Sequence, residues 1–313
     1  MAKTTDRRHF LMSSGLVALA VAGEGALGNA SAQAPPAHAS LQTRMPRLFT
    51  GLCAFSFGPL FKSGEMTFES FFERAIELKA DAVDMTGYYL KSAEPTYLNH
   101  LRNHALRNGL PFTGVACGAT LLPPSKDRRA ETIAELKKWI DITQQLAASH
   151  LRIFSGKRSL EMSQAQAVDT VVEIMKQAAD YAAEKGVILG LENQKGIAET
   201  ADLCLEIMHR VSSPFAGITL DITHFVPTPT QDNYAQIAAC ASVATQTHIR
   251  SGKFDDGTSI DLDHIWRIFA ESGYRGYMSV EYESQDRSEA QINNDVPKLM
   301  EECRRLCRTY STA

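Results

Sequence analysis

The stretch VILGLENQKG, residues 187–196, begins with a run of apolar side chains and ends on charged and amide side chains. A short, continuous apolar run bounded by polar residues is typical of a strand buried on both faces, as in a parallel sheet. Glu192 closes this run. Because an isolated buried carboxylate is costly, a glutamate in this position needs a hydrogen-bonding or cationic partner. Other strand-like segments that end on polar side chains are the first candidates to supply one.

Eight strand-like segments recur along the chain, and helical patterns separate them. The strand-like segments are residues 47–55, 80–86, 111–117, 150–155, 187–193, 216–223, 243–249 and 277–283. The amphipathic segments include residues 67–79, 94–109, 130–148, 167–186, 199–212, 261–273 and 295–310. This alternation predicts an α/β protein, a single-domain (β/α)8 TIM barrel over residues 47–313. A doubly wound open sheet is the alternative, but no G-x-G-x-x-G motif follows the first strand.

Four consecutive predicted strands end on, or close to, a side chain that can bind a metal ion: Glu192, Asp221, His248 and Glu281. In a barrel, the carboxyl ends of all strands meet at one mouth, so we expect these four side chains to converge there. Three carboxylates and one imidazole form an oxygen-rich ligand set. The sequence therefore predicts one divalent metal ion, with Mn²⁺ favoured over Mg²⁺, Co²⁺ or Zn²⁺. Such an ion would also stabilise Glu192 in its ionised form.

The order Glu192, Asp221-Ile222-Thr223-His224, His248 and Glu281 resembles the pattern of the xylose isomerase-like TIM-barrel sugar isomerases and epimerases. The resemblance covers essentially the whole mature chain. It implies that the two glutamates, the aspartate and the later histidine bind the metal. It also implies that His224 contacts the substrate and that Glu192 and Glu281 are the catalytic residues that exchange protons with it.

Two positions depart from the pattern of that family. Many members have a histidine where this chain has Gln194. Many also have a basic residue and an aspartate after the strand-seven histidine, where this chain has Ile249-Arg250-Ser251. Both positions border the pocket in the family, so the departures concern the substrate more than the metal.

Three further side chains are candidates for the same mouth. Arg250 follows His248 by two residues and should share its side of the strand, which makes it a candidate to bind a substrate oxygen or to form an ion pair at the rim. Asp84 lies near the end of the second strand and either binds a substrate hydroxyl or closes a turn. Glu283 shares a strand face with Glu281 and is its rival; Glu281 is preferred because it follows the apolar run more closely.

These residues suit abstraction of a proton next to a carbonyl, which forms an enediolate whose charge a metal ion stabilises. We expect a metal-dependent isomerase or epimerase that acts on a neutral sugar or keto-sugar. A lyase that eliminates from a keto-sugar or 3-keto-glycoside could use the same metal and base. A non-catalytic periplasmic carbohydrate-binding protein is the alternative from another class. Abasic-site endonucleases share the barrel but need more histidines and a basic face; the net charge of -4 argues against a nucleic-acid partner.

The first residues resemble an export signal. The segment TDRRHFL, residues 5–11, resembles the twin-arginine signal, and Ala30-Ser31-Ala32 offers a cleavage site. The apolar run that follows the arginines is far shorter than the roughly 20 residues that span a bilayer. We therefore expect a signal peptide over residues 1–32, a flexible leader over residues 33–46 and a periplasmic or otherwise exported protein without stable membrane insertion. A homo-oligomer is compatible with these patterns, and the six cysteines lack the C-x-x-C spacing of a zinc site.

Overall fold

The computed structural model describes residues 45–123, 125–283 and 288–311. The predicted signal peptide, residues 1–32, and residues 33–44 of the predicted leader lie outside the described residues. Within the described ranges, no helix is both long enough and apolar enough to cross a membrane.

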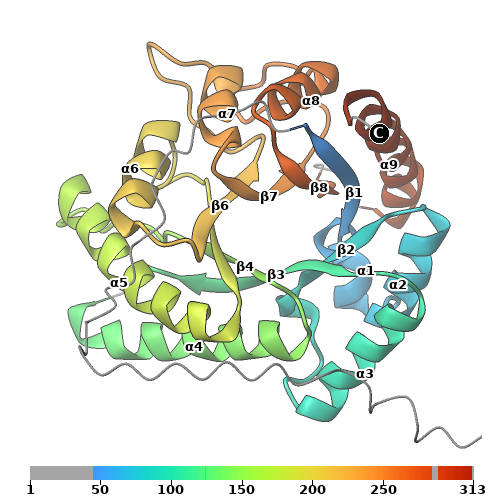
Figure 1. Cartoon of the computed structure of the whole chain (residues 1–313), viewed down its shortest axis with the longest axis horizontal. Helices are drawn as coiled ribbons and strands as arrows, with labels where there is room; N and C mark the ends of the chain where they lie inside the picture. Colours follow the sequence, from blue (N-terminus) through green and yellow to red (C-terminus); the bar gives the residue numbers. More distant parts are fainter. Residues whose placement is uncertain (1–44, 124, 284–287, 312–313) are drawn as a thin grey trace, which may run out of the picture. The chain divides into compact units, whose positions relative to one another are not determined.

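Eight parallel strands form a closed barrel in which each strand pairs with its neighbours in sequence (Figure 1). The strands are β1 (Arg47–Cys53), β2 (Ala82–Thr86), β3 (Phe112–Thr120), β4 (His150–Phe154), β5 (Ile188–Glu192), β6 (Ala216–Asp221), β7 (Ala244–Ile249) and β8 (Arg275–Val280). The barrel closes because β1 pairs with β8 as well as with β2. The predicted TIM barrel is therefore confirmed, and the open sheet is excluded.

Helices surround the barrel and cover the outer face of the strands (Figure 1). They are α1 (Gly58–Ser63), α2 (Phe68–Glu77), α3 (Pro95–Arg107), α4 (Arg129–Gln145), α5 (Gln164–Lys185), α6 (Ala201–Val211), α7 (Asn233–Ala241), α8 (Leu262–Glu271) and α9 (Glu289–Tyr310), with short 3-10 helices at Ala54–Phe57, Gly87–Tyr89 and Lys126–Arg128. The short helices α1 and α7 are absent from the sequence prediction. Helix α9 begins before the predicted residue 295 and contains Pro297 inside it.

Local signals set the ends of several helices and thereby aim the strands that follow. Ser163 caps α5 through a reciprocal capping box with Gln166. At the other end of α5, Gly186 adopts the left-handed conformation (φ 69°) that ends the helix. Strand β5 starts two residues later, at Ile188. This tight connection delivers Glu192 to the opposite, carboxyl end of the barrel.

The apolar core fills the layer between strands and helices, whereas much of the barrel lumen is polar. His150 lies in the lumen at the start of β4, with Nε2 3.0 Å from Oγ1 of Thr245. The ring fits because β5 has a glycine beside it: a Cβ atom at Gly190 would overlap the His150 ring. Higher in the lumen, the side chain of Gln246 donates a hydrogen bond to Asp84. The polar lumen leads directly to the candidate site.

Candidate metal and catalytic site

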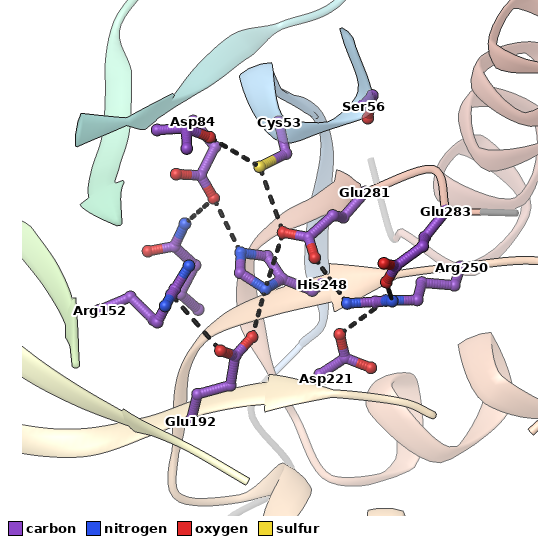
Figure 2. A network of polar contacts seen from close by, with 12 residues as sticks. Cys53, Ser56, Asp84, Arg152, Glu192, Asp221, His248, Arg250, Glu281 and Glu283 are labelled. Carbon is purple, nitrogen blue, oxygen red and sulfur yellow. Dashed lines mark hydrogen bonds and ion pairs between the residues drawn. The ribbon is translucent and has the colours of Figure 1, made fainter. Parts of the chain in front are cut away.

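Seven buried side chains at the carboxyl end of the barrel form one connected set, which we call the mouth cluster. Its members are Asp84 on β2, Arg152 on β4, Glu192 on β5, Asp221 on β6, His248 on β7, and Arg250 and Glu281 just beyond β7 and β8. Each residue is at most 8% exposed. The structure thus brings together all four predicted metal ligands, together with the predicted Arg250 and Asp84 (Figure 2).

His248 is at the centre of the mouth cluster, between three carboxylates (Figure 2). Its Nδ1 atom lies 2.7 Å from Oε1 of Glu192 and 3.3 Å from Oε2 of Glu281. Its Nε2 atom lies 3.1 Å from Oδ2 of Asp84. Burial by itself lowers the pKa of His248, but the three carboxylates outweigh it and hold that pKa well above its ordinary value. The three carboxylates therefore favour the protonated form of the His248 ring.

Asp221 is fixed by hydrogen bonds from its own turn and from the neighbouring strand. The backbone N–H and the hydroxyl of Thr223 donate to Oδ1 at 2.8 and 2.6 Å. The Asn193 side chain donates to the backbone carbonyl of Asp221 and accepts from its N–H, both at 2.8 Å. Burial raises the pKa of Asp221, but the nearby cationic Arg250 and the histidines more than reverse this, so the pKa lies well below its usual range. Asp221 is accordingly a rigidly held, ionised carboxylate.

Arg250 extends from the end of β7 across the cluster. Its Nε donates to Oδ2 of Asp221 at 2.8 Å, and its Nη2 donates to Oε1 of Glu281 at 2.6 Å. Nη1 donates to Glu283, whose side chain is 41% exposed at the rim. Nη2 also lies 3.1 Å from Nε2 of His224. Arg250 thus extends into the same cluster as His248, where its guanidinium contacts three carboxylates.

His224 lies at the edge of the cluster, where its side chain is 16% exposed. Its Nε2 atom is 3.6 Å from Oδ2 of Asp221, and its Nδ1 atom is 3.5 Å from Oδ2 of Asp255. It is therefore placed where a ligand in the mouth could reach it. Asp84 is more deeply placed, at 1% exposure, and contacts His248 and Gln246.

Three residues of the site were not identified from the sequence. Arg152 lies 3.4 Å from Oε2 of Glu192 through its Nε atom. The thiol of Cys53 donates to Oε2 of Glu281 at 3.3 Å, and Gln246 donates to Asp84. Strand periodicity could have found two of them, because Gln246 precedes His248 by two residues and Arg152 interrupts an apolar strand.

Arg152 also controls the protonation of Glu192. Burial alone raises the pKa of Glu192, but the Arg152 guanidinium and His248 outweigh that effect and lower it below its ordinary value. Glu192 is therefore ionised, which answers the question that its position at the end of an apolar strand raises.

The donor set of the mouth cluster fits a divalent cation. Two groups of ligand atoms lie within 4.8 Å of one another among the described residues: Glu192, Asp221 and His248, and Cys53, His248 and Glu281. Histidines aside, the buried charged side chains among the described residues are four carboxylates and two guanidinium groups. All six belong to the mouth cluster. An imidazole that binds a metal is neutral, so the four carboxylates would then carry two more charges than the two guanidinium groups balance. A divalent ion would supply the two missing positive charges.

A closed parallel barrel with a carboxylate–histidine cluster at the carboxyl ends of its strands defines the class of this protein: a (β/α)8 barrel with its candidate site at the position usual for that fold. The chain belongs to the xylose isomerase-like TIM barrel family, whose model matches residues 72–307.

Solved structures share this fold at low sequence identity. A xylose isomerase domain protein from Planctomyces limnophilus is 17% identical, with a TM-score of 0.68 over 85% of this chain and 99% of that chain. D-psicose 3-epimerase from Clostridium cellulolyticum H10, solved with D-tagatose, is 17% identical, with a TM-score of 0.65 over 84% and 98% of the two chains. The 3-keto-D-glucoside 4-epimerase YcjR from E. coli is 16% identical, with a TM-score of 0.64 over 82% and 100%. No curated protein matches the sequence.

Proposed function

We propose that this protein is a divalent-metal-dependent sugar isomerase or epimerase, which moves a proton at a carbon next to a carbonyl through an enediolate. The observation that carries the proposal is the convergence of Glu192 and Glu281, from β5 and from the end of β8, on the Nδ1 atom of His248 in the buried mouth (Figure 2). The fold that the chain shares with a ketose 3-epimerase and a keto-glucoside 4-epimerase supports the same class of reaction.

The metal would be held by Glu192, Asp221, His248 and Glu281, with Mn²⁺ favoured by the oxygen-rich donor set. When bound, such an ion supplies Lewis-acid stabilisation of the negative charge that develops on the substrate oxygens. Asp84 serves this site indirectly. By accepting a hydrogen bond from Nε2 of His248 at 3.1 Å, it orients the ring with Nδ1 towards the two glutamates and favours the tautomer in which Nδ1 is free to coordinate.

The proton transfers fall to the two glutamates. Glu192 is kept ionised by Arg152 and can accept a proton from one face of a bound sugar. Glu281 reaches the same Nδ1 atom of His248 from the end of β8, with the Cys53 thiol 3.3 Å from its Oε2 atom, and can return a proton to the other face of the sugar. Use of both carboxylates inverts the carbon and gives an epimer. Use of one carboxylate moves the carbonyl and gives an isomer.

The charges of the mouth favour a neutral substrate. Both buried guanidinium groups, Arg152 and Arg250, already contact carboxylates. An anionic substrate would therefore approach a mouth in which Arg152 is paired with Glu192 and Arg250 retains Glu283 at the rim. His224 at the edge of the cluster, with Arg250 beside it, is the candidate to hydrogen-bond a sugar hydroxyl.

The test is deuterium uptake from heavy water by a panel of ketoses, aldoses and 3-keto-glycosides. NMR would follow each compound with the Mn²⁺-loaded protein and again after chelation. We expect exchange at a carbon next to a carbonyl, lost when the metal is removed. The identity of the product would distinguish epimerisation, isomerisation and the elimination that a lyase catalyses. A protein that binds Mn²⁺ and a sugar but never exchanges a proton would refute the proposal and favour a carbohydrate-binding protein.

We also propose export through the twin-arginine pathway, on the sequence pattern at Arg7 and Arg8. Replacement of both arginines (Arg7→Lys with Arg8→Lys) should retain the full-length protein in the cytoplasmic fraction. Unchanged recovery of the processed protein from the periplasm would contradict this assignment.

A further inference from the structure

Arg250 occupies the space between two of the proposed metal ligands. Its Nε atom contacts Oδ2 of Asp221 and its Nη2 atom contacts Oε1 of Glu281, at 2.8 and 2.6 Å. Both are charge-assisted hydrogen bonds with distances in the strong range, and one planar guanidinium makes both. Figure 2 shows the guanidinium lying between the two carboxylates. Arg250 therefore neutralises the carboxylates that a metal would use.

The grouping of the ligand atoms shows the consequence of this position. One group of mutually close ligand atoms contains Asp221 and the other contains Glu281, while His248 belongs to both. Among the described residues, no group of three or more such ligand atoms within 4.8 Å of one another contains the aspartate and Glu281 together. The four proposed metal ligands therefore fall into two overlapping groups that share His248. The Arg250 guanidinium lies between Asp221 of one group and Glu281 of the other.

We propose that Arg250 is a built-in competitor of the divalent cation: it holds Asp221 and Glu281 in the metal-free protein and must release them when the metal enters. This inference rests on the metal site of the proposed function. The guanidinium cannot lose its charge at any ordinary pH, so it is displaced as a cation. Its third partner is Glu283, whose side chain is 41% exposed. The displaced guanidinium would remain paired with Glu283 at the rim.

The contacts of Arg250 have a physical consequence both for the metal-free protein and for metal binding. Without a cation between them, two ionised carboxylates in a buried site would be strongly destabilising, so Arg250 stabilises the empty site. The same contacts oppose metal binding, because the ion must replace two charge-assisted hydrogen bonds. The metal affinity of the protein is therefore set partly by a residue that is not a ligand.

Arg152 provides a matched control for charge alone. It is the other buried guanidinium of the mouth cluster, and it contacts Oε2 of Glu192 at 3.4 Å. The difference from Arg250 is the second carboxylate: Arg250 contacts both Asp221 and Glu281 through one guanidinium. Arg152 therefore adds the same charge to the site without lying between two proposed ligands.

The experiment is a Mn²⁺ titration of the metal-free full chain, in which electron paramagnetic resonance measures the free ion. Arg250→Gln should lower the dissociation constant for Mn²⁺ by about tenfold, equivalent to ~1.4 kcal/mol. Arg152→Gln should change it much less. Equal or weaker binding by Arg250→Gln would overturn the inference while leaving the metal site intact. Equal tightening by both variants would also overturn it, because charge alone would then account for the effect.

Two further measurements guard against loss of folding in Arg250→Gln. Arg250→Lys keeps the charge but loses the fork that spans both carboxylates, so its Mn²⁺ affinity should lie between those of the wild type and Arg250→Gln. An affinity identical to that of the wild type would count against the inference. Mn²⁺ should also raise the melting temperature of Arg250→Gln more than that of the wild type. If the wild type and every variant fail to bind Mn²⁺, the proposed metal site fails, and this inference fails with it.

Discussion

Oδ2 of Asp84 accepts a hydrogen bond from Nε2 of His248 at 3.1 Å, although the two residues are 164 positions apart in the chain. Gln246, two residues before His248 on the same strand, donates to the same carboxylate oxygen. Strands β2 and β7 are thereby linked across the lumen. Asp84 acts as a positioning residue: it contacts the histidine that would hold the metal and sets which ring nitrogen faces the mouth.

Asp84→Asn should weaken metal binding by roughly 10- to 100-fold, because an amide neither fixes the ring nor raises its basicity as a carboxylate does. Mn²⁺ titration of the variant measures this. Asp81→Asn is the matched control, since Asp81 lies just before the same strand and accepts hydrogen bonds from Thr50 instead. An affinity of Asp84→Asn equal to that of the control would refute the positioning role.

Glu281→Gln should abolish proton exchange with the substrate while leaving the fold intact, because the amide cannot accept or return the proton. Glu283→Gln is the comparison. The Glu283 side chain is 41% exposed and contacts Arg250, so its loss should leave most of the exchange rate. Deuterium incorporation followed by NMR measures both variants. Retained exchange in Glu281→Gln, with loss in Glu283→Gln, would transfer the proton-transfer role to Glu283.

Metal removal should lower the thermal stability of the protein, since a cation that binds only the folded state stabilises it by mass action. At a free Mn²⁺ concentration 100 times the dissociation constant, the gain is about 2.7 kcal/mol. Thermal unfolding with Mn²⁺ and with chelator measures the difference. His248→Ala should lose most of it, because the central nitrogen ligand is gone. A melting temperature that Mn²⁺ leaves unchanged in the wild type would argue against the metal site.

The buried His150 predicts a pH dependence that arises mainly from burial of its own ring. Burial, with smaller contributions from His248 and Arg152, lowers the pKa of His150 from 6.5 to about 3. The unfolded chain therefore binds a proton below pH 6.5 that the folded protein does not. The contribution of His150 to stability is complete above pH 6.5 and is lost as the pH falls towards 3, by ~1.4 kcal/mol per pH unit.

Urea unfolding of the wild type and His150→Gln at several pH values between 6.5 and 4.5 measures this effect. The variant should lose stability less steeply on acidification, whatever its stability at neutral pH. His209→Gln, at an exposed position on α6, should keep the wild-type slope. Parallel pH curves for the wild type and His150→Gln would show that His150 does not carry the effect.

The sequence was sufficient for the strand ends but not for the partners of the side chains there. Alternation of short apolar runs and amphipathic segments predicts the eight strands, since both patterns are local. The closed barrel then brings Glu192, Asp221, His248 and Glu281 to one mouth by symmetry. Helices α1 and α7 were not predicted; both are short, with 6 and 9 residues, and so carry little helical periodicity.

By itself, the sequence determined the barrel, the end of the barrel that carries the polar residues, and the side of β7 on which Arg250 lies. These follow from local periodicity and from the period of two along a strand. Only the tertiary structure decided that Asp84 orients His248, that Arg152 contacts Glu192, and that Arg250 lies between Asp221 and Glu281. The physical reason is that these contacts join strands that are distant in the chain. They depend on the register of the closed sheet and on the direction of long side chains, neither of which local periodicity specifies.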